Sequence, residues 1–361
     1  MSTTAARLAA TGAALRRRDV DALMVSVGSD LPYLTGYRAM PLERLTMLVV
    51  PASGEPVLVV PELEAPRVVP DRSFHLRPWG ESEDPIRIVA DLVGGARRIA
   101  IGDQTWATFL ISLQERLPTA RFENAVPIMS EMRIRKDDDE IAALRAAGAA
   151  VDEVVASLAG TRFGGKDERH LAREITEMTL ESGHGSVEFA IVASGPNGAS
   201  PHHEAGERVI GAGDAVVVDF GGRMDGYCSD TTRMFVVGEP DPEFVLAYDV
   251  LFRAQEAAVQ AVAPGVTAAS VDRAARDLIT SAGYGEWFIH RTGHGIGRDA
   301  HEEPYIVEGN DMVLESSMVF SIEPGIYLPG RWGMRIEDIV VATDGGVERL
   351  NRSSRDLRFV D

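Results

Sequence analysis

The C-terminal part of this 361-residue chain carries acidic residues inside apolar segments, and this feature constrains the fold most. Burying a carboxylate is unfavourable unless a cation or charged partner compensates it, so a bound metal is the simplest explanation for several such segments. Carboxylates with one imidazole suit Mn²⁺, Co²⁺, Fe²⁺ or Zn²⁺ rather than Cu⁺ or an iron–sulfur cluster. The candidate metal ligands are Asp219 in VVVDFGG, Asp230 in GYCSDTTR, His294 in HRTGHGIG, Glu323 in FSIEPGIY and Glu337 in MRIEDIVV.

The four acidic candidates form two pairs, and each pair is predicted to lie on one β-hairpin. A Gly-rich turn separates the segments of Asp219 and Asp230, so these side chains can face each other across antiparallel strands. Pro329-Gly330 supplies the turn between Glu323 and Glu337. Two such hairpins can bind two cations about 3.5–4 Å apart. The cations would lower the pKa of a water between them and so give hydroxide near neutral pH. Each residue alone would more often be solvent-facing or ion-paired, so the prediction rests on the combination.

Composition narrows the class of protein. Hydrophobic content of 45% and charged content of 25% are typical of a soluble globular chain. The N-terminal 20 residues predict a surface helix rather than a signal peptide, with a transit peptide as the alternative. The single cysteine, Cys228, rules out an intramolecular disulfide and favours the cytoplasm. A net charge of −19 disfavours a nucleic-acid or anionic-membrane partner.

The chain is predicted to form two domains, residues 1–135 and 136–361. Alternating helices and strands in the first part indicate an α/β domain with a layered sheet, and it lacks a Gly-rich phosphate loop. A charged cluster marks the boundary, where Asp137 is a candidate N-cap with Glu140 three residues later. The predicted strands of the first domain are 21–27, 45–51, 56–62, 97–103 and 121–126; its predicted helices are 5–18, 84–93, 107–117 and 127–135.

The second domain is predicted to pair helices with strands, as in a duplicated unit with helices outside a curved sheet. Its predicted helices are 139–160, 167–183, 244–262 and 269–283. A strand at 189–195 leads into the loop 195–206, and the two strands that carry Glu323 and Glu337 are expected to close the chain. Cys228 is interpreted as a small packed side chain rather than a nucleophile, because no base is evident beside it.

The segments SGPNGASPHH, VVVDFGG, GYCSDTTR, HRTGHGIG, HEEPYI, SIEPGIY and MRIED, in this order, resemble the creatinase, prolidase and methionine aminopeptidase superfamily of pita-bread metallopeptidases. The motifs cover about residues 137–350. The resemblance implies an α/β (α+β) fold, with a creatinase/prolidase-like N-terminal domain and a C-terminal catalytic domain whose curved antiparallel sheet is covered by helices. It also implies ligand roles: Asp219 on one metal, His294 and Glu323 on the other, and Asp230 and Glu337 bridging both.

The same resemblance implies catalytic residues beside the metals. His202 and His301 would lie next to the scissile carbonyl, where imidazoles can donate to the developing oxyanion and shuttle protons. His203 is the adjacent alternative to His202. Glu323 would act as general base as well as metal ligand.

Further residues are predicted to bind substrate or orient ligands. By resemblance His290 would line the prolyl side of the substrate, and Arg335 would hold a carboxylate ligand in place. Tyr327 is a further candidate beside Arg335. Arg38 and Arg44 in the first domain are candidates for meeting a substrate carboxylate.

The resemblance is nearest to bacterial Xaa-Pro dipeptidases, or prolidases, and implies a metal-dependent exopeptidase that cleaves Xaa-Pro dipeptides. An Xaa-Pro bond is a tertiary amide without an N–H, and a pair of metal ions can polarise its carbonyl without needing that group. We expect two divalent ions per subunit, Mn²⁺ first among them, in a cytoplasmic homodimer. The alternatives are an Xaa-Pro aminopeptidase for longer peptides, a hydrolase or lyase of a small zwitterion, and a metal-retaining binding protein without turnover.

Overall fold

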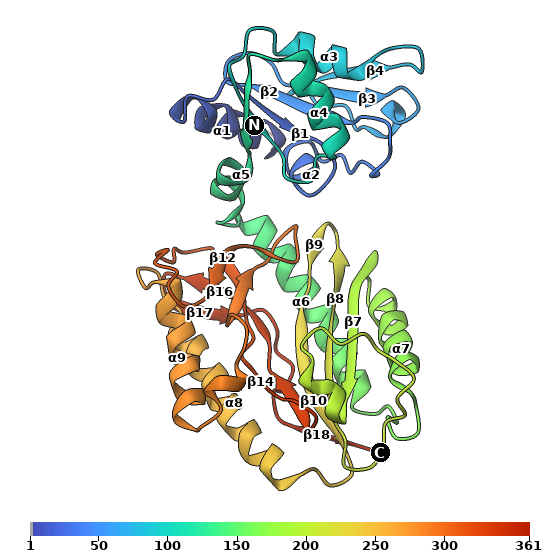
Figure 1. Ribbon diagram of the computed structural model, residues 1–361, viewed down its shortest axis with the longest axis vertical. Helices are drawn as coiled ribbons and strands as arrows, with labels where there is room; N and C mark the ends of the chain where they lie inside the picture. Colours follow the sequence, from blue (N-terminus) through green and yellow to red (C-terminus); the bar gives the residue numbers. More distant parts are fainter. Residues whose placement is uncertain (1–2) are drawn as a thin grey trace. The chain divides into compact units, whose positions relative to one another are not determined.

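The computed structural model describes residues 3–361, and the chain divides into two compact units, Met1–Arg133 and Ile134–Asp361 (Figure 1). Each unit has its own hydrophobic clusters. The mixed α/β architecture of both units confirms the predicted fold class. Assigning separate roles to residues 1–135 and 136–361 stays a prediction.

The N-terminal unit is a six-stranded mixed sheet between two helical layers. Its strand order is β4-β3-β2-β1-β5-β6, with β1 antiparallel to β2 and parallel to β5. Side chains alternate across the sheet, so Leu23 and Val25 of β1 pack in one cluster while Met24 packs in the other. The strands are β1 (Ala22–Val25), β2 (Met47–Pro51), β3 (Val57–Pro61), β4 (His75–Trp79), β5 (Arg98–Ile101) and β6 (Arg121–Asn124).

Helices of this unit cover both faces of the sheet. Buried residues of α1, α2 and α5 share a cluster with Leu23, and those of α3 and α4 share a cluster with Met24. The sequence prediction missed two elements, the six-residue α2 and the strand β4. β4 is a sheet edge, where its polar side chains and Pro78 are tolerated. The helices are α1 (Thr3–Arg17), α2 (Asp30–Thr35), η1 (Ala65–Arg67), α3 (Pro85–Leu92), α4 (Ala107–Arg116) and α5 (Val126–Arg133).

The C-terminal unit contains two five-stranded sheets and one two-stranded sheet, with helices outside them (Figure 1). One sheet has the order β18-β10-β8-β7 with β9 paired to β8, and the other has the order β12-β11-β13-β16-β17. The strands are β7 (Ser186–Ser194), β8 (Ala215–Met224), β9 (Tyr227–Cys228), β10 (Thr231–Val237), β11 (Gly293–Gly295), β12 (Glu302–Ile306), β13 (Val319–Ile322), β14 (Gly325–Leu328), β15 (Trp332–Arg335), β16 (Asp338–Thr343), β17 (Gly346–Arg349) and β18 (Arg358–Val360).

The four α-helices of this unit begin and end near their predicted bounds, whereas two short 3-10 helices were not predicted. The α-helices are α6 (Asp138–Leu158), α7 (Glu168–Glu181), α8 (Pro242–Gln260) and α9 (Ala268–Ser281), and the 3-10 helices are η2 (Gly195–Ala199) and η3 (Gly285–Trp287). The predicted N-cap of α6 is confirmed: Asp137 accepts from the Glu140 N–H at 2.9 Å, and Glu140 accepts from the Asp137 N–H at 3.1 Å. Within residues 3–361, no helix is both long and apolar enough to cross a membrane.

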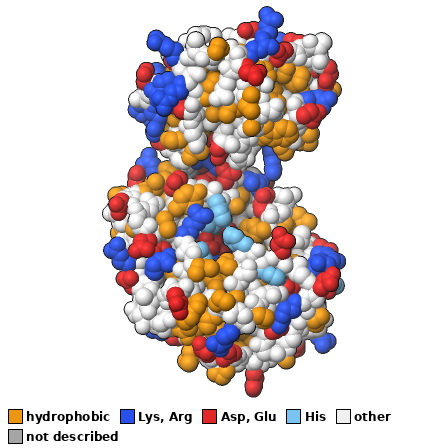
Figure 2. Space-filling view, in the orientation of Figure 1, with side chains coloured by type: hydrophobic (Ala, Val, Ile, Leu, Met, Phe, Trp, Pro, Cys, Tyr) orange, Lys and Arg blue, Asp and Glu red, His pale blue; other side chains and the backbone are white. Residues whose placement is uncertain are grey.

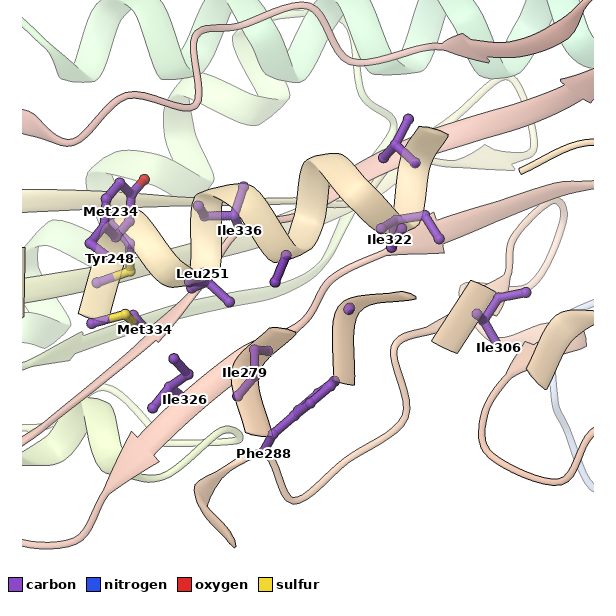
Figure 3. Packing of buried hydrophobic residues seen from close by; sticks show 14 of the residues in the cluster. Met234, Tyr248, Leu251, Ile279, Phe288, Ile306, Ile322, Ile326, Met334 and Ile336 are labelled. Atoms are coloured by element: carbon purple, nitrogen blue, oxygen red, sulfur yellow. The ribbon is translucent and has the colours of Figure 1, made fainter. Parts of the chain in front are cut away.

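One apolar cluster joins α8 and α9 to the strands that lead to the candidate ligands. Leu251 of α8 and Ile279 of α9 belong to the same buried cluster as Ile322 and Ile336 (Figure 3). Ile322, the last residue of β13, and Ile336, just after β15, immediately precede Glu323 and Glu337 in the chain. Packing therefore fixes the backbone from which both carboxylates project.

The prediction that the strands of Glu323 and Glu337 close the chain is wrong. Two further strands follow, β17 and the short β18. β18 pairs in parallel with β10, so Val360 lies opposite Val237 at an edge of the sheet that also contains β8. Three residues are too few to give a reliable period-2 pattern, and only long-range pairing defines this strand.

Candidate metal centre

Asp219 and Asp230 come from neighbouring antiparallel segments, as the first predicted hairpin requires. Asp219 lies in β8 opposite Thr232 of β10, and Asp230 is the residue just before Thr231, where β10 begins. Both aspartates are buried. The turn between them also contains the two-residue strand β9, which pairs with the end of β8.

The second predicted hairpin is interrupted, and this corrects the strand assignment of two ligands. Glu323 lies at the junction of β13 and β14, and Glu337 at the junction of β15 and β16. β13 pairs with β16 in one sheet, whereas β14 pairs with β15 in another. Pro324 has no N–H to give to a ladder, so the pairing breaks beside Glu323. The break places Glu323 and Glu337 opposite one another, between the β13–β16 pair and the β14–β15 pair.

His294 lies in β11, next to the strand that leads to Glu323. Its Nε2 is 3.1 Å from Glu323 Oε1 and 3.8 Å from Asp230 Oδ2, while its Nδ1 is 3.1 Å from the Gly295 carbonyl oxygen. Donation from Nδ1 to that carbonyl leaves the Nε2 lone pair facing the carboxylates. A Cβ at Gly293 would lie 1.8 Å from the carbonyl oxygen of Ser321, so the close approach of β11 to β13 requires glycine at this position.

The donor set fits divalent metal ions. Ligand atoms of Asp230, His294 and Glu337 all lie within 4.8 Å of one another. Among residues 3–361, Asp219 Oδ1 and Glu337 Oε1 are buried without a hydrogen-bond partner. Burial raises the pKa of the Asp230 and Glu337 carboxyls, and neighbouring carboxylates raise it further. Concentrated buried charge with free oxygen lone pairs is the arrangement that a cation compensates.

Glu323 differs electrostatically from the other carboxylates. Burial would raise its pKa, but the contact with His294 and the charge of Arg335 outweigh burial and lower it to about 2. The Ser321 hydroxyl also donates to Glu323 Oε1 at 3.1 Å. Glu323 is therefore held as an ionised acceptor beside the imidazole of His294.

A chain of hydrogen bonds links Arg335, Tyr327 and His290. The Arg335 guanidinium donates to Asp219 Oδ2 and, at 2.6 Å, to the Tyr327 hydroxyl, which lies 2.9 Å from His290 Nε2. His290 Nδ1 is 2.7 Å from the Arg291 carbonyl oxygen, so Nδ1 carries the proton and Nε2 accepts. Burial lowers the pKa of His290 to about 4 and keeps the ring neutral. Arg335 thus orients both Asp219 and the tyrosine behind His290.

A cavity of about 610 Å³ opens over these groups. His202 and His301 are exposed at this cavity, and the His301 ring lies 3.9 Å from the His294 ring, centroid to centroid. The cavity walls still desolvate part of the His301 ring, and this effect together with the neighbouring His294 lowers the pKa of His301 to about 4. Figure 2 shows histidine side chains gathered beside acidic ones on this unit. The lining also includes the apolar residues Phe189, Ile191, Pro201 and Ile289, together with Ser200, His290, Arg291, Arg335 and the five candidate ligands.

The predicted site residues therefore meet in one place, with three qualifications. Tyr327 is buried beneath the cavity, where it bonds Arg335 rather than facing substrate. His203 points to Glu168 instead of the cavity, which favours His202 of the two adjacent histidines. Arg38 and Arg44 lie on the N-terminal unit, where Arg44 pairs with Glu43 and Glu81, and their substrate contacts stay a prediction.

Sequence reasoning missed Thr232. Its hydroxyl donates to Glu337 Oε2 at 2.8 Å and accepts from Arg335 Nε at 3.1 Å. The signal was present, because Thr232 lies two residues after Asp230 and strand side chains repeat with a period of two. Cys228 is buried, and burial raises the pKa of its thiol to about 12, so the thiolate is disfavoured there.

Comparison with known proteins places this site in a family. Residues 142–344 match the model of metallopeptidase family M24, and residues 7–135 match the creatinase/prolidase N-terminal domain. The chain belongs to metallopeptidase family M24 and carries this N-terminal domain.

Individual relatives match nearly the whole chain. It is 45% identical to a probable dipeptidase PepE of Mycobacterium bovis, over 99% of this chain and 96% of that one. It is 37% identical to an Xaa-Pro dipeptidase of Lactobacillus helveticus, over 94% of this chain and 95% of the relative. The crystal structure of a prolidase from Thermococcus sibiricus superposes with a TM-score of 0.94 at 39% identity, covering 100% of both chains.

Proposed function

We propose that this protein is a metal-dependent dipeptidase that hydrolyses the bond before proline in Xaa-Pro dipeptides. The observation that carries the proposal is the cluster of Asp219, Asp230, His294, Glu323 and Glu337 at the floor of a cavity lined by histidines. Relatives named as dipeptidases and Xaa-Pro dipeptidases, matched over nearly their full length, support the substrate class.

Two divalent cations, held by these five residues, would acidify a water and polarise the scissile carbonyl. Asp230 and Glu337 would bridge both ions, Asp219 would hold one, and His294 with Glu323 the other. Mn²⁺ is the first expectation, with Co²⁺, Zn²⁺ or Fe²⁺ as alternatives.

The protein's own groups would handle protons and orientation. Glu323 lies next to the metal-facing imidazole, and by resemblance it would accept a proton as general base. His202 and His301 are exposed at the cavity and can donate to the oxyanion and to the leaving prolyl nitrogen. His290 and the apolar side chains of Ile289 and Phe189 would contact the prolyl ring.

A peptide panel tests this function. After chelation and restoration of Mn²⁺, Co²⁺ or Zn²⁺, we expect metal-dependent release of proline from Ala-Pro, Met-Pro, Leu-Pro or Gly-Pro and little cleavage of Ala-Pro-Ala. Equal or better tripeptide cleavage would reassign the protein as an Xaa-Pro aminopeptidase. No turnover with any metal would contradict a peptidase and favour a small zwitterionic substrate or a binding protein. A homodimer and a cytoplasmic location stay predictions.

A further inference from the structure

The loop of residues 195–206 forms one wall of the cavity and presents His202 at its mouth. The first part of the loop is the short 3-10 helix η2, and the rest, 200–206, has turns but no strand or helix. His202 itself is exposed, and Ala205 is only half-buried. Apolar packing is therefore a weak source of order for this wall, and polar contacts must fix it.

One buried carboxylate supplies several of those contacts; the Arg169 N–H also donates to the Gly206 carbonyl at 3.0 Å, and Arg335 donates to the Pro201 carbonyl at 3.5 Å. Glu168, at the start of α7, is fully buried, and its two oxygens accept hydrogen bonds from both ends of the loop. Oε1 accepts from the Ser194 N–H and hydroxyl, each at 2.7 Å, and from Asn197 Nδ2 at 3.0 Å. Oε2 accepts from His203 Nε2 at 2.7 Å and from the Gly206 N–H at 3.3 Å.

These contacts require an ionised carboxylate. Burial raises the pKa of Glu168, but the hydrogen bonds from Ser194, His203 and Asn197 outweigh burial and lower it. An ionised carboxylate only accepts, so His203 must carry its proton on Nε2 and donate. Hydrogen bonds to a buried charge are stronger than neutral ones. The bond from His203 to Glu168 therefore also restrains His202, the adjacent residue in the chain.

We propose that Glu168 is a positioning residue for catalysis, which holds the loop 195–206 through Ser194, Asn197 and His203 and thereby places His202 over the metal centre. The inference rests on the proposed function through the role of His202. Glu168 does not line the cavity itself; it acts from beneath the loop.

Glu168→Gln is the first test, because glutamine keeps the shape and replaces one acceptor oxygen by an NH₂ group. Donors approach both oxygens of Glu168, so either orientation of the amide sets a donor against donors. We expect kcat for Ala-Pro to fall by about 10-fold to 100-fold with a smaller change in KM, because the contribution of His202 is made to the transition state. Bound metal, measured by elemental analysis, should stay at the wild-type level.

Glu140→Gln is the matched control. Glu140 is also a buried carboxylate in the first turn of a helix, but it bonds Asp137 and Tyr227, away from the loop. Hydrogen exchange followed peptide by peptide should speed up in 195–206 for E168Q and keep its wild-type rate there for E140Q. This readout needs no turnover.

A double variant shows whether the effect passes through His202. If it does, H202N/E168Q is no slower than H202N alone. Multiplied effects in the double variant, or a wild-type kcat in E168Q, would overturn the inference while leaving the proposed function intact. A wild-type kcat in H202N would overturn the catalytic role of His202, and this inference with it.

If E168Q does not fold, variants of His203, the hydrogen-bond partner of Glu168, test the inference instead. His203→Gln can still donate from a nitrogen at nearly the same reach, so it should restore kcat relative to His203→Ala. Equal kcat in the two variants would contradict the inference.

Discussion

Asp230 and Glu337 place negative charge where it favours binding of a cation and disfavours folding of the metal-free protein. Both are buried, and burial raises the pKa of each carboxyl. Glu337 raises the pKa of Asp230 further, Glu323 and Asp219 raise that of Glu337, and Arg335 is a fully buried cation beside them. Arg335 is already bonded to Asp219 and Tyr327. The residual negative charge makes the metal-free centre a source of instability.

Glu337→Gln should therefore separate stability from metal binding. Neutralising this carboxyl relieves repulsion with Asp230 and keeps the acceptor for Thr232, so we expect the Tm of the metal-free protein to rise by about 2–4 °C. The same change removes a candidate metal ligand, so we expect bound metal and proline release each to fall by about 10-fold or more. Calorimetry and elemental analysis of matched samples measure the two effects.

Glu315→Gln, at an exposed residue paired with Arg135, serves as the control for loss of one negative charge. It should leave Tm and metal content unchanged. A metal-free E337Q protein less stable than wild type would contradict the electrostatic account of the centre.

Among the secondary-structure elements, α8 is tied to the end of the chain by ion pairs around Glu256. Glu256 of α8 contacts Arg349 at the end of β17 at 2.6 Å and Arg355 at 2.7 Å. Both arginines also approach Asp338, which follows Glu337. The network thus joins a helix, two strands and the segment 349–355 behind the metal centre.

The ion pairs of Glu256 predict how the Tm of the protein depends on pH. Burial would raise its pKa, but hydrogen bonds from Gln260, Arg349 and Arg355 and the charge of Arg349 lower it from 4.5 to about 2. A depressed pKa in the folded state means that the stabilisation is complete above pH 4.5 and is lost as pH falls towards 2. Glu256→Gln should therefore lower Tm at pH 7, and its Tm should converge with that of wild type between pH 4.5 and 2. A Tm difference that persists unchanged at pH 2 would contradict this assignment.

Most elements were predictable because local signals agreed with the fold. The cap of α6 and the continuous apolar run of β1 follow from neighbouring residues alone. The failures have long-range causes. Pairing with β10 defines β18, and local sequence carries no signal for that pairing. Pro324 is a local signal for the break in the second hairpin, but only the folded chain shows that β13 and β14 join different sheets.

In the whole molecule, the candidate ligands and the supporting role of Arg335 were predictable from the motifs, but the contacts of the other supporting residues were not. Arg335 and Asp219 are 116 residues apart, and Thr232 meets Glu337 across 105 residues. Glu168 looked like an ordinary helix residue, because only the folded chain brings Ser194 and His203 to its carboxylate. Motif residues reveal which chemistry is possible, whereas the groups that orient them emerge from tertiary contacts.

Metal titration of the metal-free protein tests the central claim most directly. Mn²⁺ is added stepwise while proline release from Ala-Pro and bound metal are both measured. The five-ligand centre predicts that activity is absent without metal, rises with added Mn²⁺ and saturates at two bound ions per chain. Full activity without metal, or saturation at a single ion, would contradict a catalytic centre built on all five residues.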